Sequence, residues 1–124
     1  MSQHNVLVVD DSPTIRKIIE ITLKKENIRV RSAPDGLTAL SEVVDANPDL
    51  ILLDVMLPHM DGYQVCQIIR RNPDFKSVPI IMLSGRDGVF DKVKGRLAGS
   101  TAYLTKPFDP KELVKVLSRY LNGK

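Results

Sequence analysis

The sequence predicts an α/β fold in which a doubly wound, five-stranded parallel sheet is flanked by five helices. Short runs of branched aliphatic residues alternate with longer segments of helical periodicity, and five of each occur along the chain. The run Leu-Ile-Leu-Leu at 50–53 is apolar throughout, which is typical of a strand buried on both faces of a parallel sheet. With 124 residues, 43% hydrophobic and 27% charged, we expect one globular domain over residues 1–124.

Five runs are predicted to be strands because they are short, rich in Val, Ile and Leu, and bounded by turn residues. The second run alternates apolar residues with Arg29 and Arg31, which favours a strand at the edge of the sheet. The predicted strands are residues 6–9, 28–33, 50–53, 79–83 and 101–104.

Five segments are predicted to be helices from the spacing of their apolar residues and from the residues at their ends. Ser12 is the expected cap of the first helix, with Pro13 in its first turn, and Asp109 with Glu112 is the expected capping box of the last. The second helix is predicted over 36–46, the third from about 61 to before Pro73, and the fourth over about 88–98, stopped by Gly99. The side chains expected to face the core are Ile15, Ile18, Ile19, Thr22, Leu23, Leu37, Leu40, Val43, Val44, Val65, Ile68, Ile69, Val89, Phe90, Val93, Leu97, Leu113, Val116, Leu117, Tyr120 and Leu121. Cys66 is expected to pack in the core.

The composition argues against several classes of protein. The net charge is +3, but the 18 basic residues are spread over every segment among acids, so we expect no direct nucleic-acid binding. No apolar run approaches the roughly 18 residues of a membrane span, and no secretory signal begins the sequence. A single cysteine excludes an internal disulfide and fits a reducing compartment, so we expect a cytoplasmic protein.

Reactive side chains stand where four of the five predicted strands end. Asp10 and Asp11 follow the first strand, Asp54 the third and Ser84 the fourth, while Lys106 comes just after the fifth. In the flavodoxin-like strand order 2-1-3-4-5, the acidic ends are neighbours at the point where the order reverses. Clustered carboxylates favour Mg²⁺. We therefore predict that Asp54 attacks phosphorus, while Lys106 and Ser84 stabilise the phosphoryl oxygens.

Each of these residues also has a simpler interpretation. Asp10 or Asp11 could cap the first helix, Ser84 could be a turn residue, and Lys106 could be a solvated side chain. Only their joint placement at the strand ends favours the chemical interpretation. His59, in the loop after Asp54, is interpreted as a solvated residue.

The chain resembles the response-regulator receiver family, including its stand-alone, chemotaxis-receiver-like members. The resemblance rests on Val8-Val9-Asp10-Asp11-Ser12, Leu53-Asp54-Val55-Met56-Leu57-Pro58, Met60-Asp61-Gly62, Leu83-Ser84 and Lys106-Pro107-Phe108. It implies that a histidine kinase donates a phosphoryl group to Asp54. It also implies that Mg²⁺ is bound by Asp11, Asp54 and the backbone carbonyl of Met56, with Asp10 acting mainly through a water.

The same resemblance implies how a signal would leave the domain. Ser84 and Tyr103 would act as a switch that changes the surface of the fourth helix, fifth strand and fifth helix. The Lys106–Pro107 bond would be cis. The chain would be a phosphoacceptor that assists its own phosphorylation and dephosphorylation rather than an enzyme.

Residues 88–100 and 103–108 more closely resemble regulators of pilus-based twitching or phototactic motility. Because no DNA-binding or enzymatic domain follows before Lys124, we expect a single receiver domain with no output domain. Output would then run through a downstream effector protein, and the chain would be a monomer or a weak dimer.

Two other functions compete with this interpretation. A haloacid-dehalogenase-type phosphatase also uses an Asp nucleophile at a strand end, but it has a second Asp two residues further on, where this chain has Met56. A degenerate receiver would bind partners without phosphorylation; the intact set of Asp10, Asp11, Asp54, Ser84 and Lys106 argues against it.

Overall fold

The computed structural model of the chain describes residues 3–85 and 89–121. Its sheet has five parallel strands in the order β2-β1-β3-β4-β5, which confirms the predicted fold and strand order. The strands are β1 (Asn5–Val9), β2 (Arg29–Ala33), β3 (Leu50–Asp54), β4 (Ile80–Ser84) and β5 (Ala102–Thr105). At most of the strand ends, the observed bound differs from the predicted one by one residue.

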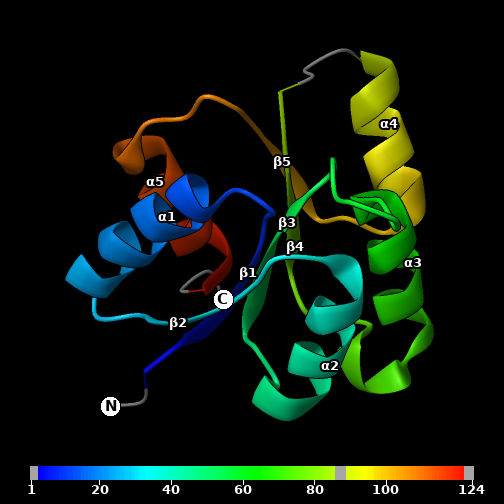
Figure 1. Cartoon of the computed structure of the whole chain (residues 1–124), viewed down its shortest axis with the longest axis horizontal. Coiled ribbons are helices and arrows are strands. Elements are labelled where there is room, and N and C mark those ends of the chain that lie inside the picture. The colour runs from blue at the N-terminus through cyan, green and yellow to red at the C-terminus, as the bar shows by residue number, and fades with distance from the viewer. Residues whose placement is uncertain (1–2, 86–88, 122–124) are drawn as a thin grey trace.

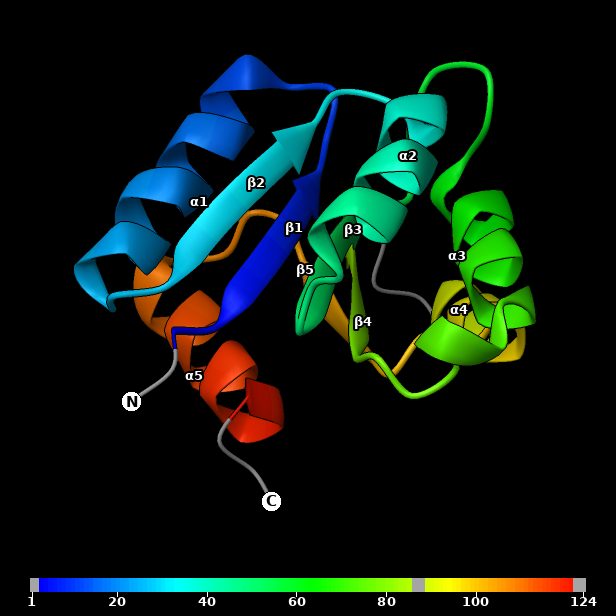
Figure 2. The ribbon, with the colours of Figure 1, turned by 90° about the horizontal axis from the view of Figure 1, so that it is seen from below.

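Five helices and one short 3₁₀ turn connect the strands. They are α1 (Pro13–Lys25), α2 (Gly36–Ala46), α3 (Gly62–Arg71), η1 (Pro73–Phe75), α4 (Val89–Ala98) and α5 (Pro110–Leu121). Figures 1 and 2 show α1 and α5 on one face of the sheet and α2, α3 and α4 on the other. Since each connection joins parallel strands, the helices run back along the sheet and bury both of its faces.

The central strands form the core because their side chains alternate between two apolar layers. Leu7 and Val9 pack beneath α2, α3 and α4, whereas Val6 and Val8 pack beneath α1 and α5. Every residue of β3 and β4 is buried. The edge strand β2 is half-exposed, as its alternating sequence predicted.

Local polar contacts fix the helix ends as predicted. The Ser12 hydroxyl accepts the Ile15 N–H at 3.2 Å, and Asp109 and Glu112 each accept the other's backbone N–H at 2.9–3.0 Å. Gly99, which follows α4, has a φ of 107° and lies against Arg70, whose Cγ would be only 2.7 Å from a Cβ at this position. A side chain here would therefore face both an unfavourable backbone angle and a clash.

Several predictions of inward-facing helix residues are wrong. Ile18, Leu37, Val44, Ile68, Val93 and Leu97 are exposed. A helix lying on a sheet buries a narrow stripe, and in α2 that stripe contains Val43, as predicted, together with Ala39, which was not predicted to face the core. Gly88 and the side chains of Val89 and Phe90 lie outside what the structure describes.

Cys66 is buried, and burial raises the pKa of its thiol to about 11, which supports a packing role.

Among the described residues, no helix has both the length and the apolar character needed to cross a membrane.

Candidate functional site

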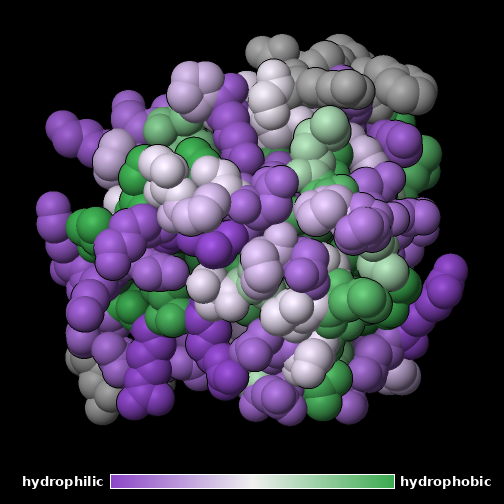
Figure 3. Space-filling model, in the orientation of Figure 1, coloured by the Kyte–Doolittle hydropathy of each residue, from purple (hydrophilic) through white to green (hydrophobic). Residues whose placement is uncertain are grey.

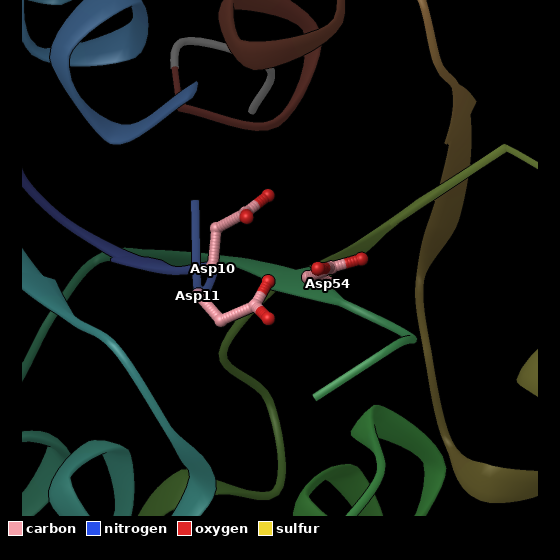
Figure 4. Close-up of side chains that lie close together, drawn as sticks. All are labelled: Asp10, Asp11 and Asp54. Carbon is pink, nitrogen blue, oxygen red and sulfur yellow. The ribbon is translucent and has the colours of Figure 1, made fainter. Parts of the chain in front are cut away.

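The acidic residues meet at the carboxyl end of the sheet because β1 and β3 are neighbours in register. Val9 pairs with Leu53, so Asp10, which follows β1, and Asp54, the last residue of β3, lie side by side. Asp11 joins them from the start of the β1–α1 loop. One carboxylate oxygen from each of the three residues lies within 4.8 Å of the others. Figure 4 shows the three side chains projecting into the same space beyond the strand ends.

Asp10 is fully buried, and both of its carboxylate oxygens have partners. Its Oδ1 accepts the Ser12 N–H at 2.9 Å, and its Oδ2 accepts from Lys106 Nζ at 2.8 Å. The backbone N–H of Ile15 goes to the Ser12 hydroxyl, so Ser12 and not Asp10 is the cap of α1. Burying a carboxylate without such partners costs free energy, so the stability of the buried Asp10 depends on its bond to Lys106.

Lys106 is the positive charge of the site. Its Nζ lies 2.8 Å from Asp10 Oδ2 and 3.3 Å from Asp54 Oδ1, and its side chain is 22% exposed. The backbone holds it there, since the Lys106 N–H donates to the Ser84 carbonyl at 2.7 Å. The bond between Lys106 and Pro107 is cis, as predicted. The interpretation of Lys106 as a solvated side chain is therefore wrong.

The electrostatics of Asp54 reflect its crowding. Burial, followed by the negative charge of Asp10, raises the pKa of Asp54 to about 6, although Lys106 and the Met56 N–H act in the opposite direction. Burial alone would lower the pKa of the Lys106 ammonium, but its bonds to Asp10 and Asp54 outweigh burial and raise it. The carboxylates of the site thus carry more negative charge than the single lysine neutralises.

The other predicted residues occupy the surroundings of the cluster. Ser84 is buried at the end of β4, paired in register with Thr105 of β5. Tyr103 is half-buried beside Met82, and Lys92 Nζ lies 6.0 Å from its ring centre. The Met56 N–H donates to Asp54 Oδ1 at 3.2 Å, whereas the Met56 side chain is exposed. The role of the Met56 carbonyl as a metal ligand stays a prediction.

Two contacts of the site were not predicted from the sequence. The Arg16 guanidinium donates to the Asp10 carbonyl at 2.7 Å. Gly62 approaches the backbone of Asp54 so closely that a Cβ would lie 2.3 Å from its carbonyl oxygen. The motif Met60-Asp61-Gly62 marks a turn, but only the folded chain shows that the glycine permits the loop to close over Asp54.

The chemistry of the three carboxylates fits a hard divalent cation. Mg²⁺ takes oxygen ligands, usually few from the protein, and leaves positions for water or phosphate oxygens. Asp11 is exposed and Asp54 is only 3% exposed, so the cluster has one side open to solvent and one set in the core. These residues could hold a cation at the point where a phosphoryl group would approach Asp54.

Comparisons with known proteins agree on one family. Residues 6–118 match the response regulator receiver domain. The chain is 49% identical over 116 residues to Protein PilG of Pseudomonas aeruginosa, covering 94% of this chain and 86% of PilG. It spans less than half the length of several relatives named as transcriptional regulators.

Solved structures give the same result. Chemotaxis protein CheY4 of Vibrio cholerae superimposes with a TM-score of 0.93 at 37% identity, covering 97% of this chain and all of CheY4. The receiver domain of sensor histidine kinase PA1611 from Pseudomonas aeruginosa, with a magnesium ion coordinated in its active-site cleft, superimposes with a TM-score of 0.90. It is 33% identical, and the match covers 98% of this chain and all of that one.

Proposed function

The chain belongs to the response regulator receiver domain family, and on that basis we propose that Asp54 accepts a phosphoryl group from a histidine kinase. The observation that carries the proposal is the convergence of Asp10, Asp11 and Asp54 within 4.8 Å, with Lys106 bonded to the cluster. The phosphatase alternative has no support from the family assignment. The degenerate receiver remains the second candidate, and the labelling experiment below separates the two.

In the proposed reaction, an oxygen of the Asp54 carboxylate forms a bond to phosphorus as the bond from phosphorus to the donor breaks. The donor nitrogen leaves with the electron pair and takes up a proton, and Asp54 becomes an acyl phosphate. The Lys106 ammonium and the Met56 N–H already lie against Asp54, so they would stabilise negative charge on the transferred group. Mg²⁺, held by Asp11 and Asp54 with Asp10 beside them, would neutralise carboxylate and phosphoryl oxygens.

Labelling tests this assignment. Incubation with Mg²⁺ and acetyl phosphate is expected to add one phosphoryl group to the wild type and none to Asp54→Asn, because the amide cannot act as the nucleophile. Intact-mass spectrometry counts the added groups. Asp11→Ala is expected to label at least tenfold more slowly, because the cation loses a charged ligand. The exposed acid variant Asp74→Asn is the control and should label normally. Absence of labelling in the wild type would support a degenerate receiver, and equal labelling of Asp54→Asn would disprove the acceptor.

We further propose that Ser84 and Tyr103 carry the signal to the surface of α4, β5 and α5. The support is their arrangement: Ser84 pairs with Thr105 of β5, and Tyr103, two residues earlier on β5, packs against the core layer beneath α2, α3 and α4. A Cβ on Gly95 of α4 would lie 3.8 Å from the Tyr103 ring, so the ring rests directly on that helix. Movement of the ring would therefore change how α4 packs.

Tyr103→Ala is expected to leave Asp54 labelling within about twofold of wild type, because the ring faces α4 rather than the carboxylates. It is expected to abolish the change that phosphorylation produces in α4. Hydrogen exchange of α4 peptides, measured with and without acetyl phosphate and Mg²⁺, reports that change. Loss of labelling in a folded Tyr103→Ala protein would instead assign the ring a role in positioning Asp54.

The cellular setting is part of the proposal. We place the chain in the cytoplasm, in a motility or taxis pathway with a histidine kinase upstream and an effector protein downstream. The likeness to a chemotaxis protein and the resemblance of residues 88–100 to motility regulators support this placement.

A further inference from the structure

A groove of about 390 Å³ lies between the C-terminal turns of α1 and the N-terminal turns of α5. Three lysines surround it, and apolar atoms form much of its surface. Its lining residues are Thr22, Lys25, Glu26, Pro110, Lys111, Val114 and Lys115. The two helices are basic beyond the groove, since α1 has four basic residues and one acid and α5 has three basic residues and one acid. The groove therefore offers an apolar surface within a positive rim.

The complementary surface is α2, on the opposite face of the sheet. Leu37 is 72% and Val44 65% exposed, and their spacing of seven residues puts them on one side of the helix, two turns apart. Residues 34–50 contain four acids and no Lys or Arg. Figure 3, in the orientation of Figure 1, shows apolar side chains exposed among polar ones in the lower part of the view, where α2 lies. This apolar helix surface surrounded by negative charges is complementary to the groove, which is apolar with a positive rim.

We propose that α2 of one copy of the chain docks into the α1–α5 groove of a second copy. Leu37 and Val44 would enter the groove while Asp45, which is exposed, would meet the lysines of its rim. The other helix acid, Glu42, already forms an ion pair with Arg31, in which Glu42 Oε1 lies 2.8 Å from Arg31 Nη2, and it is not needed. Charge complementarity selects this occupant, since α2 is the one described helix whose charged residues are all acidic.

The positions of the two surfaces determine the kind of assembly. A single chain cannot bring α2 to its own groove, because α2 and the pair α1 and α5 cover opposite faces of the sheet (Figures 1 and 2). The contact joins different surfaces of the two copies, so association is head-to-tail and continues beyond a dimer unless it closes into a ring. One helix against two is a small interface, so we expect a Kd of roughly 0.1–1 mM.

A charge-exchange experiment tests the pairing. The groove variant Lys111→Glu/Lys115→Glu and the helix variant Ser41→Lys/Asp45→Lys change only exposed positions. Sedimentation velocity at low salt and up to about 1 mM chain is expected to show that wild type associates. Each variant alone is expected to associate at least tenfold more weakly, because its two surfaces then have the same sign. An equimolar mixture of the variants is expected to recover association, since each surface again meets one of opposite charge.

Two controls make the outcome specific. Arg71→Glu/Lys76→Glu changes net charge by the same amount as the groove variant but away from the groove, so it should associate like wild type. Leu37→Ser/Val44→Ser keeps every charge and is expected to lose association. Wild type that stays monomeric over the whole range, a groove variant that associates normally, or a mixture that stays dissociated would each overturn the proposal. Circular dichroism establishes that every variant is folded.

Discussion

Lys106→Met is expected to lower the free energy of unfolding by about 3 kcal/mol at pH 8 without Mg²⁺. The Lys106 ammonium bonds both Asp10 and Asp54, and those carboxylates are fully and almost fully buried. Removing it leaves two neighbouring negative charges without a cation in the core, which costs far more than a surface ion pair contributes. Methionine keeps most of the aliphatic stem, so the loss reflects charge rather than packing.

The dependence of this loss on pH and metal identifies its cause. At pH 5 Asp54, whose pKa is raised to about 6, can take up a proton instead, so Lys106→Met is expected to be closer to wild type there. Added Mg²⁺ is expected to restore most of the stability at pH 8, because the cation replaces the ammonium and binds only the folded chain. Urea unfolding at the two pH values, with and without Mg²⁺, measures both effects. Lys111→Met, on the surface of α5, is the control and should change little. A loss that is the same at both pH values and with metal would mean that the ammonium does not neutralise this cluster.

The fold could be predicted because its signals repeat. Most strands are short aliphatic runs, and the residues that mark the starts of the first and last helices, Ser12 and Asp109, make the very contacts expected of them. The direction in which each helix faces was harder to predict. Leu37 and Val44 have helical spacing, yet α2 lies on the sheet through Ala39 and Val43. Periodicity defines an apolar side but does not say which part of it meets the sheet, and at 100° per residue Leu37 and Val44 lie beside the buried stripe rather than on it.

The candidate site was predictable where it depends on register and not where it depends on side-chain contacts. Acids that end adjacent parallel strands must meet, so the cluster of Asp10 and Asp54 follows from strand order alone. That Lys106 bonds two carboxylates at once depends on the path of the chain after β5. No sequence pattern indicates that Arg16 reaches the Asp10 carbonyl, because an arginine early in a helix has many possible partners.

Asp54→Asn is expected to raise the free energy of unfolding at pH 8 without Mg²⁺ by about 1–2 kcal/mol. The pKa of Asp54 is raised from its ordinary 3.8 to about 6, first by burial and then by Asp10. A carboxyl group whose pKa is higher in the folded chain binds its proton more tightly there. Its contribution to stability is therefore complete below pH 3.8 and is lost as the pH rises through about 6. This difference in pKa corresponds to a gain in unfolding free energy of roughly 3 kcal/mol at most. The gain from Asp54→Asn is smaller, because the amide is also desolvated on folding and its bond to Lys106 is weaker.

The shape of the pH profile separates this effect from a simple change in packing. Near pH 4 Asp54 is protonated in the folded chain and keeps most of its contribution to stability, so wild type is expected to be at least as stable as Asp54→Asn there. Between pH 4 and 7 wild type is expected to fall progressively below Asp54→Asn, apart from changes that both share through other groups, and above pH 7 the difference should be constant. Urea unfolding at half-unit pH intervals measures this difference, with Asp74→Asn as an exposed control that should follow wild type. Mg²⁺ should reverse the order at pH 8, because only wild type retains all three carboxylates to bind it. A stability difference that does not change with pH would show that the charged Asp54 carboxylate does not destabilise the folded chain. It would also remove the electrostatic reason for a cation at this site.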